Sequence, residues 1–322
     1  MKAVRIHEHG GPDVLRYEDV PVPPIGKKDA LVKLSASGVN YVDIYYRKGL
    51  SQTKLPATLG VEGAGVVTSV GEEVSDLAVG DRVAFANSLG SYAEYISLPA
   101  ERFVKLPEGM DERLAAASIL QGMTARYLTH DTFPLKAGQR VLVHAGAGGA
   151  GLMLIQMCKL IGAYVVTTVS TEEKASIAKE AGADHVILYT EQDFEAETKR
   201  VTNGEGVHVV YDSVGRTTFD KSLGSLVRRG YLVLFGHSSG PVEGFAPLRL
   251  QRGGSLYLTR PTLYDYIITR RELLGQANPV LDLVKSGRLK VRIFKTLPLA
   301  QAAAAQGLLE SRATVGKVLL EI

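Results

Sequence analysis

Six small residues near the middle of the chain have the types and spacing of a phosphate-binding loop. They read Gly146-Ala147-Gly148-Gly149-Ala150-Gly151 and fit G-x-G-x-x-G, which is a weak pattern by itself in a chain with 34 glycines. The context strengthens it, because an apolar strand is predicted before the loop and a helix after it. Gly146 would permit a tight turn, Gly148 a close approach to a pyrophosphate, and Gly151 close packing of helix on strand. Since a helix N-terminus attracts phosphate, we predict a dinucleotide site; the alternative is a tight turn without a ligand.

The residues that follow the second predicted strand, 164–169, bear on which dinucleotide would bind. NAD sites usually carry Asp or Glu there to bond the ribose 2′-hydroxyl, whereas this chain has Ser170 and Thr171. These neutral residues do not repel a 2′-phosphate, and Lys174 is close enough in sequence to reach one. We interpret Ser170 and Glu173 as a helix capping box. The pattern favours NADPH, although Lys174 taken alone could equally be a solvated surface lysine.

The residue types give little support for metal or nucleophile chemistry. The chain has one cysteine, Cys158, and seven histidines, of which only His7 and His9 are closely spaced. Zinc requires several Cys, His or carboxylate ligands that converge, and we place the two histidines on an exposed edge strand. No cysteine and histidine can be argued to form a nucleophile and its base. The cofactor would therefore carry the chemistry, while the protein positions it and excludes water.

Two kinds of segment must position these residues. Up to about residue 107 the chain reads as short strands separated by turn signals, which suggests an antiparallel barrel or sandwich with one helix at 41–49. After a helix at 111–131, strands and helices alternate, which predicts a parallel sheet covered by helices on both faces. We expect strands at 140–145, 164–169, 185–189, 207–212 and 231–236, and helices at 149–161, from 172, near 191–202 and near 216–228. The final strands, 290–294 and 317–322, would either rejoin the first domain or edge the second sheet.

Composition excludes several classes of function. The chain has 322 residues, 45% hydrophobic and 22% charged, with a net charge of +3. So small a charge argues against nucleic acid or an anionic membrane as partner. The first residues do not resemble a signal peptide, and no stretch approaches the roughly 18 apolar residues that span a bilayer. We expect a cytoplasmic protein.

Over essentially its whole length the chain resembles the zinc-independent medium-chain dehydrogenases/reductases of the quinone oxidoreductase (zeta-crystallin-like) type. The most specific segment is GQRVLVHAGAGGAGLMLIQMCK, residues 138–159. Further resemblance lies in 7–15, 38–49, 59–67, 79–83, 120–128, 181–187, 209–215, 232–240, 258–263 and 309–320. The resemblance implies an α/β fold: a Rossmann doubly wound parallel sheet, 124–263, that binds NADPH, plus a GroES-like β-rich catalytic domain, 1–123 and 264–322, with the substrate in the cleft between them.

Departures from the zinc-dependent relatives refine the implied activity. Those relatives have Cys where this chain has Asn40, and Gly-His-Glu where it has Gly60-Val61-Glu62. Two metal ligands are therefore missing, and we expect no zinc. Without a Lewis acid the enzyme should reduce acceptors that are already electrophilic. The resemblance implies an NADPH-dependent quinone reductase; the alternatives are a reductase of 2-alkenals or enones, and a non-enzymatic RNA-binding or structural protein that keeps its NADPH site.

The resemblance also implies site residues and an oligomeric state. Tyr45 and Asn40 would face the substrate, unless Tyr45 only packs at a domain interface, and His237 stands where Asn is expected. A homodimer would form by pairing of an edge strand, 231–236 or 255–259. The cofactor would contact Tyr41, Val42, Asp43, Thr124, Tyr127, Gly146, Gly148, Gly149, Ala150, Gly151, Ser170, Thr171, Lys174, Tyr189, Ser213, Phe235, Gly236, Ser238, Ser239 and Arg312.

Overall fold

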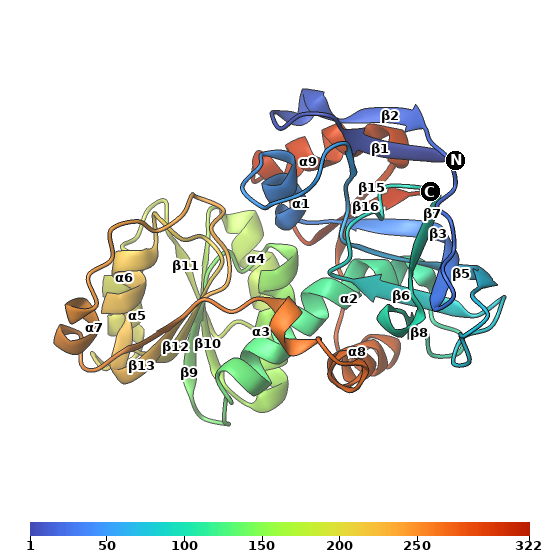
Figure 1. Ribbon diagram of the computed structural model, residues 1–322. Helices are drawn as coiled ribbons and strands as arrows, with labels where there is room; N and C mark the ends of the chain where they lie inside the picture. The colour runs from blue at the N-terminus through green and yellow to red at the C-terminus, as the bar shows by residue number, and fades with distance from the viewer. The chain divides into compact units, whose positions relative to one another are not determined.

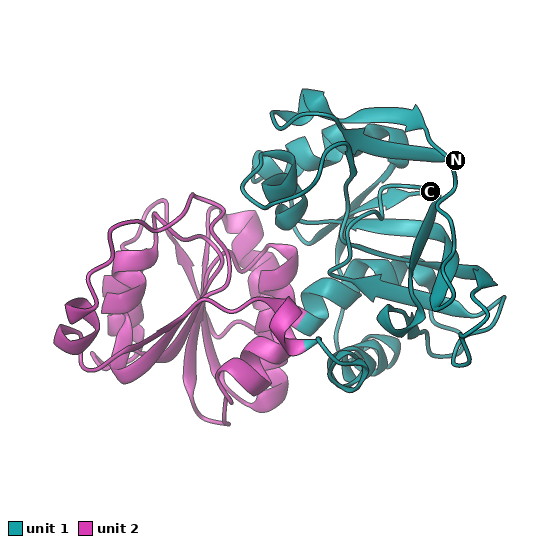
Figure 2. Ribbon diagram, viewed as in Figure 1, with its two compact units in different colours: residues 1–123, 267–322 teal, residues 124–266 magenta.

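The computed structural model describes residues 1–322. The chain divides into two compact units (Figure 2): the first comprises Met1–Met123 and Ile267–Ile322, and the second comprises Thr124–Tyr266. No helix is long and apolar enough to cross a membrane.

The second unit contains one parallel sheet of six strands. Their order is β11-β10-β9-β12-β13-β14, which is the order of a Rossmann fold numbered from the glycine-loop strand outwards. This confirms the predicted doubly wound sheet. The strands are β9 (Arg140–Val143), β10 (Tyr164–Val169), β11 (His185–Leu188), β12 (Val207–Asp212), β13 (Leu226–Leu234) and β14 (Tyr257–Thr259).

Helices cover both faces of this sheet, as the alternating pattern predicted. Figure 1 shows α3 and α4 on one face and α5 and α6 on the other. The core between them is built from alternate apolar strand residues, Leu142, Val166 and Val210 among them. The helices are α3 (Gly149–Ile161), α4 (Glu172–Glu180), α5 (Phe194–Val201), α6 (Phe219–Gly224) and α7 (Leu248–Arg252).

One predicted helix is too long. We expected it near 216–228, but α6 ends at Gly224 and β13 already begins at Leu226. Leu226 pairs with Val207 in the sheet and is buried in the core. Two arginines follow in the sequence and hide this strand start, because exposed charges interrupt the apolar run that marks a buried strand.

The first unit is built on a seven-stranded sheet and a three-stranded sheet. The larger one has the order β15-β16-β3-β5-β6-β8, with β7 also paired to β3, and the smaller one has the order β2-β1-β4. The strands are β1 (Lys2–Ile6), β2 (Arg16–Asp19), β3 (Asp29–Val39), β4 (Ala57–Thr58), β5 (Glu62–Val70), β6 (Arg82–Ala86), β7 (Tyr95–Pro99), β8 (Val104–Lys105), β15 (Ile293–Pro298) and β16 (Lys317–Glu321). Because β16 pairs with β3, the final strands rejoin the first unit, which decides between the two alternatives left by the sequence.

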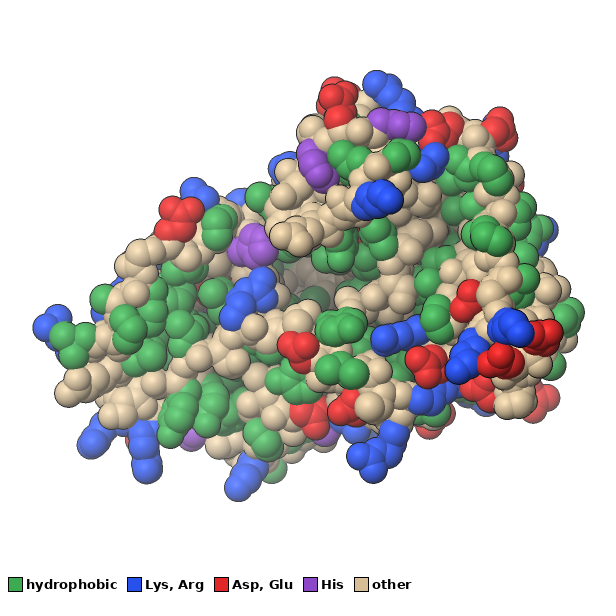
Figure 3. Space-filling model, viewed as in Figure 1, with side chains coloured by type: hydrophobic (Ala, Val, Ile, Leu, Met, Phe, Trp, Pro, Cys, Tyr) green, Lys and Arg blue, Asp and Glu red, His purple; other side chains and the backbone are tan.

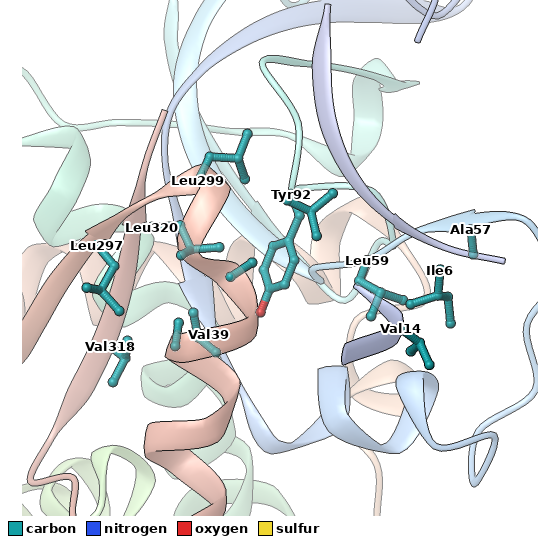
Figure 4. Close-up of a cluster of buried hydrophobic side chains, with 13 residues drawn as sticks. Ile6, Val14, Val39, Ala57, Leu59, Tyr92, Leu297, Leu299, Val318 and Leu320 are labelled. Atoms are coloured by element: carbon teal, nitrogen blue, oxygen red, sulfur yellow. The ribbon is translucent and has the colours of Figure 1, made fainter. Parts of the chain in front are cut away.

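Three helices complete this unit: α1 (Tyr41–Arg47), α8 (Arg270–Lys285) and α9 (Ala302–Glu310). A fourth, α2 (Glu112–Tyr127), contains the boundary between the units and continues into a π-helical turn, Leu128–Thr132. Tyr92 lies in the middle of one hydrophobic core (Figure 4), between Leu320 and Val39 on one side and Leu59 on the other. Its ring thus joins the N-terminal and C-terminal strands, while its hydroxyl leads to the polar groups of α1.

Candidate functional site

The glycine loop turns sharply between β9 and α3. Ala145 adopts a left-handed conformation with φ of 55°, and its carbonyl accepts the Gly148 N–H at 2.9 Å. A Cβ on Gly151 would collide with the Ala145 carbonyl, and one on Gly146 with the Thr167 side chain. Both glycines are therefore required by close packing of loop and helix against the strands.

The first turn of α3 is well suited to bind a phosphate. Its N-cap is Gly148, which offers no side chain to cap the helix. The N–H groups of Gly149, Ala150 and Gly151 belong to the first helical turn, and such groups have no carbonyl acceptor within the helix. Gly148, Gly149 and Ala150 are half-buried, so the backbone is accessible to a ligand. The residues present thus fit the pyrophosphate of a dinucleotide.

The ends of β10 and β11 bring the adenosine-side residues together. The Tyr189 N–H donates to the Val169 carbonyl, which places Tyr189 beside the end of β10, and the residue is 44% exposed. The helix cap predicted at Ser170 is wrong: the N-cap is Thr171, whose hydroxyl accepts the Lys174 N–H. Ser170 therefore has a hydroxyl that is not needed by the helix. No carboxylate follows β10 directly, so this end of the sheet suits a 2′-phosphate.

The ends of β12 and β13 form the next part of the crevice. The Ser238 N–H donates to the Ser213 carbonyl at 3.2 Å, and Phe235 and Gly236 both donate to the Asp212 carbonyl. The Ser239 hydroxyl is half-buried and has partners within the protein, because it donates to the Val214 carbonyl and accepts from the Thr217 N–H. These predicted residues lie at the carboxyl ends of the strands, beyond the point where the sheet order reverses, which is where such sheets bind ligands.

The remaining predicted residues of the second unit lie near the end of α2. Tyr127 is buried and stacks on Tyr266 with ring centroids 4.3 Å apart. Burial raises the pKa of its hydroxyl far above the ordinary value. Thr124 is half-buried one turn earlier.

His237 lies after β13, where the resemblance led us to expect Asn. Its Nδ1 atom is 3.0 Å from the Arg260 guanidinium, and both burial and the arginine lower its pKa.

In the first unit, α1 carries the predicted tyrosines. Tyr41 and Tyr45 are half-buried with ring centroids 6.0 Å apart, and Val42 is half-buried between them. Burial raises the pKa of the Tyr41 hydroxyl. Arg312 opposes that shift in two ways, through its positive charge and through a hydrogen bond to the hydroxyl. Tyr41 and the exposed Arg312 are therefore neighbours, as a shared anion site would need.

Asp43 faces the interior of the first unit. It is fully buried, and its Oδ2 accepts the Asn40 N–H at 2.8 Å and the Tyr92 hydroxyl at 2.9 Å. Burial raises its pKa to about 7. These contacts do not support the cofactor contact expected for Asp43; they indicate that its carboxyl orients the first turn of α1.

Asn40 is also enclosed, in a cluster that sequence analysis did not find. Its Oδ1 accepts from Lys317 Nζ at 2.8 Å and from Gln121 at 3.4 Å. Its Nδ2 donates to Glu62 at 2.9 Å and to Gly38 at 3.2 Å. All four hydrogen-bonding positions of the amide are filled. This supports a role in positioning α1 in place of the expected substrate contact.

The charges in this cluster pair with each other. Lys317 and Glu62 are fully buried and form an ion pair, and the second Glu62 oxygen accepts the Leu120 N–H at 2.9 Å. No group of three His, Cys, Asp or Glu side chains anywhere is arranged to hold a metal. The ammonium group would repel a cation beside Glu62, so these residues do not fit a zinc ion. The sequence feature that could have indicated this cluster is Lys317, a charged residue inside the apolar run VGKVLLEI.

Comparison with known proteins gives concordant matches. Residues 149–284 match the family model described as zinc-binding dehydrogenase, and residues 26–108 match the alcohol dehydrogenase GroES-like domain. Quinone oxidoreductase 1 of Escherichia coli (strain K12) is 44% identical, and the alignment covers 98% of each chain. The crystal structure of Escherichia coli quinone oxidoreductase complexed with NADPH superimposes over all of both chains with a TM-score of 0.98 at 42% identity. The 2-haloacrylate reductase of a Burkholderia species is 40% identical over 99% of this chain and 98% of its own.

Proposed function

The chain belongs to the quinone oxidoreductase family of the medium-chain dehydrogenases/reductases, and from this premise we propose that it is an NADPH-dependent reductase of quinones. The observation that carries the proposal is the continuous set of accessible groups along the carboxyl edge of the parallel sheet. These groups include the start of α3, which would bind phosphate, and the end of β10, which no acidic residue follows directly. NADPH, when bound, supplies a hydride.

The chain's own residues would bind and orient the two reactants. Gly149 and Ala150 would hold the pyrophosphate, and Ser170 with Lys174 the 2′-phosphate, because hydroxyl and ammonium groups both donate to phosphate oxygens. On α1, the Tyr45 hydroxyl would contact the acceptor, and its donated hydrogen bond would favour the oxygen on which negative charge develops. Arg312, beside Tyr41, would attract an anionic group.

We further propose that the reaction needs no metal. The support is the Lys317 ammonium group, which already neutralises Glu62, together with the amide Asn40 at the start of α1. A quinone is electrophilic enough to accept a hydride without a Lewis acid, whereas an alcohol substrate would need one.

A second candidate is reduction of an activated carbon–carbon double bond. The relative named 2-haloacrylate reductase favours it, since it is nearly as similar to this chain as the quinone oxidoreductases are. An RNA-binding role finds less support: Figure 3 shows lysine and arginine side chains dispersed over the visible face and not gathered into one continuous patch.

The test is the rate of NADPH oxidation against quinones, 2-alkenals, 2-haloacrylate and aldehydes, with NADH in parallel and a chelator present. Fast, chelator-resistant and NADPH-selective turnover of quinones is the expected result. Turnover of alkenals or 2-haloacrylate with quinones inert would keep the cofactor and establish the second candidate. NADPH binding without turnover of any acceptor would refute both and revive the non-enzymatic alternative.

A further inference from the structure

A buried chain of polar side chains lies beneath the crevice of the second unit, and the binding roles above do not use it. His144, the last residue before the turn at Ala145, is fully buried. Its Nδ1 lies 2.9 Å from the Thr168 hydroxyl and its Nε2 lies 3.0 Å from the Ser222 hydroxyl. Ser222 in turn donates to Asp212 at 2.9 Å. These hydrogen bonds thus link the end of β9 with β10, α6 and β12.

The direction of each hydrogen bond follows from the carboxylate. Ser222 donates its one proton to Asp212 Oδ2, so its oxygen must accept from His144. The Nε2 atom of His144 therefore carries the proton, and Nδ1 accepts from Thr168. Burial lowers the pKa of His144, which agrees with a neutral ring. In this arrangement both ring nitrogens of His144 have partners.

The Asp212 end of the chain organises two loops of the crevice. Its Oδ1 accepts the Val214 and Gly215 N–H groups at 2.7 and 3.0 Å. Its carbonyl accepts from Phe235 and Gly236. The Thr168 end organises the third loop, because the Thr168 carbonyl accepts the Gly146 N–H at 3.0 Å. The glycine loop and the loops that follow β12 and β13 are therefore attached to one connected set of buried groups.

We propose that Thr168, His144, Ser222 and Asp212 are positioning residues that hold the glycine loop, residues 213–215 and residues 235–236 in the relative geometry that NADPH requires. The inference rests on the proposed function. It assigns a specific role to groups that touch no ligand: they set the spacing of the crevice for the pyrophosphate and nicotinamide. The adenosine 2′-phosphate end, at Ser170 and Lys174, lies outside the chain of hydrogen bonds.

Replacing His144 removes the middle of the chain and should affect the two ends of the cofactor differently. In His144→Leu both side-chain hydrogen bonds of residue 144 are lost, so the Thr168 end, which holds the glycine loop, is no longer linked to the Asp212 end, which holds the other two loops. We expect the Kd for NADPH to rise at least tenfold, while the Kd for adenosine 2′-monophosphate changes less than threefold. His144→Gln can keep a donor close to the position of Nε2, so it should restore NADPH binding to within about threefold of the original. Calorimetric titration of both ligands gives the two constants.

The matched control is another histidine of the same sheet. His208 accepts the Arg140 N–H at 3.1 Å at the amino ends of the strands, opposite the crevice. His208→Leu should lower the melting temperature without changing the ratio of the two dissociation constants. Two results would overturn the inference. One is an unchanged ratio of the Kd for NADPH to the Kd for adenosine 2′-monophosphate in His144→Leu; the other is the same altered ratio in His208→Leu.

A second variant tests the inference if His144→Leu does not fold. Ser222→Ala removes one oxygen atom, separates His144 from Asp212, and should raise the Kd for NADPH selectively in the same way; an unchanged ratio in that variant would equally overturn the inference. Failure of the unaltered protein to bind NADPH would be a different result, because it would refute the proposed function itself.

Discussion

Among single residues, Lys174 has the largest expected effect on the choice of cofactor. The strand before it ends at Val169, and the acidic pair Glu172 and Glu173 is exposed on the first turn of α4. A charge-assisted contact with the 2′-phosphate should be lost in Lys174→Ala. We expect NADPH binding to weaken by roughly 10- to 100-fold, equivalent to about 1.4–2.8 kcal/mol, with NADH little affected. Measured dissociation constants for both cofactors test this.

Lys179 supplies the control for that experiment. It lies in the last turn of the same helix and is exposed, so Lys179→Ala changes the charge of α4 by the same amount. Its effect on either cofactor should be small. Equal losses of NADPH and NADH binding in Lys174→Ala would show that this ammonium group does not face the 2′-phosphate.

Asp43 leads to a prediction about pH and stability. Its pKa in the folded protein is about 7, against an ordinary 3.8, because the carboxyl is buried. Between these values the folded state holds a proton that the unfolded state has released, so stability must fall as pH rises. Asp43→Asn removes this titration while keeping a similar shape. From pH 5 to pH 8 the variant should gain about 3 kcal/mol relative to the original protein, measured by urea unfolding at each pH.

The control for Asp43 is a carboxylate with the opposite behaviour. Asp81 is half-buried, and its hydrogen bond to Lys105 lowers its pKa. Both the folded and the unfolded forms are ionised above pH 5, so Asp81→Asn should show a constant difference over the same range. A constant difference for Asp43→Asn would mean that Asp43 is ionised in the folded protein at pH 5.

At the same scale, the sequence supports a prediction for some residues and gives no indication of others, for a physical reason. The glycine loop and Lys174 are local signals, because a strand, a loop and a helix start are contiguous in the chain. The contact between Lys317 and Asn40 joins residues 277 positions apart. Periodicity in one segment cannot reveal a partner so distant. Asp43 was expected to touch the cofactor because the segment around it matched a family pattern, which does not indicate side-chain direction.

At the level of elements, the buried ion pair connects β16, β5 and the start of α1. Lys317 and Glu62 lie in neighbouring parts of the sheet, and both bond Asn40, the N-cap of α1. Lys317→Met would leave the Glu62 charge buried without a cation. We expect the free energy of unfolding to fall by about 3–5 kcal/mol. Chemical denaturation of the variant measures the loss.

A double replacement separates loss of the pair from loss of packing. In Glu62→Gln combined with Lys317→Met no charge is left buried, so the double variant should be more stable than Lys317→Met alone. Lys27→Met is the surface control, because the Lys27–Glu72 pair is exposed and should contribute little. If the double variant is less stable than Lys317→Met, the lysine contributes through packing and not through charge.

The order and type of the central elements followed from the sequence because their signals are strong. The strands 164–169 and 207–212 and the helix 149–161 were predicted with the observed ends. The start of β13 was predicted wrongly, because exposed arginines interrupt the apolar run that marks a buried strand. The place of β15 and β16 could not be derived, since strand pairing over the full chain length is decided by register and not by local pattern.

For the whole molecule, the remaining question is how copies of the chain associate. One of the two edge strands proposed from the sequence, 231–236, belongs largely to β13 and is unavailable, because it pairs with β12 and β14 on its two sides. The other, within 255–259, forms β14, which is an edge of the parallel sheet. An unpaired edge can add a strand from a second copy across a two-fold axis. We therefore propose a homodimer that pairs β14 with β14.

Tyr257 allows a direct test of this dimer. It lies on β14, is 49% exposed, and stacks on Tyr231 with centroids 4.4 Å apart. Antiparallel pairing about a two-fold axis brings the two copies of this short strand together, so Tyr257→Asp would place like charges close to each other. Light scattering should give twice the chain mass for the original protein and a single chain mass for the variant. Tyr164→Asp, on the interior strand β10 where the side chain is 36% exposed, should remain dimeric. A monomeric original protein would refute the dimer, and a dimeric Tyr257→Asp would move the interface away from β14.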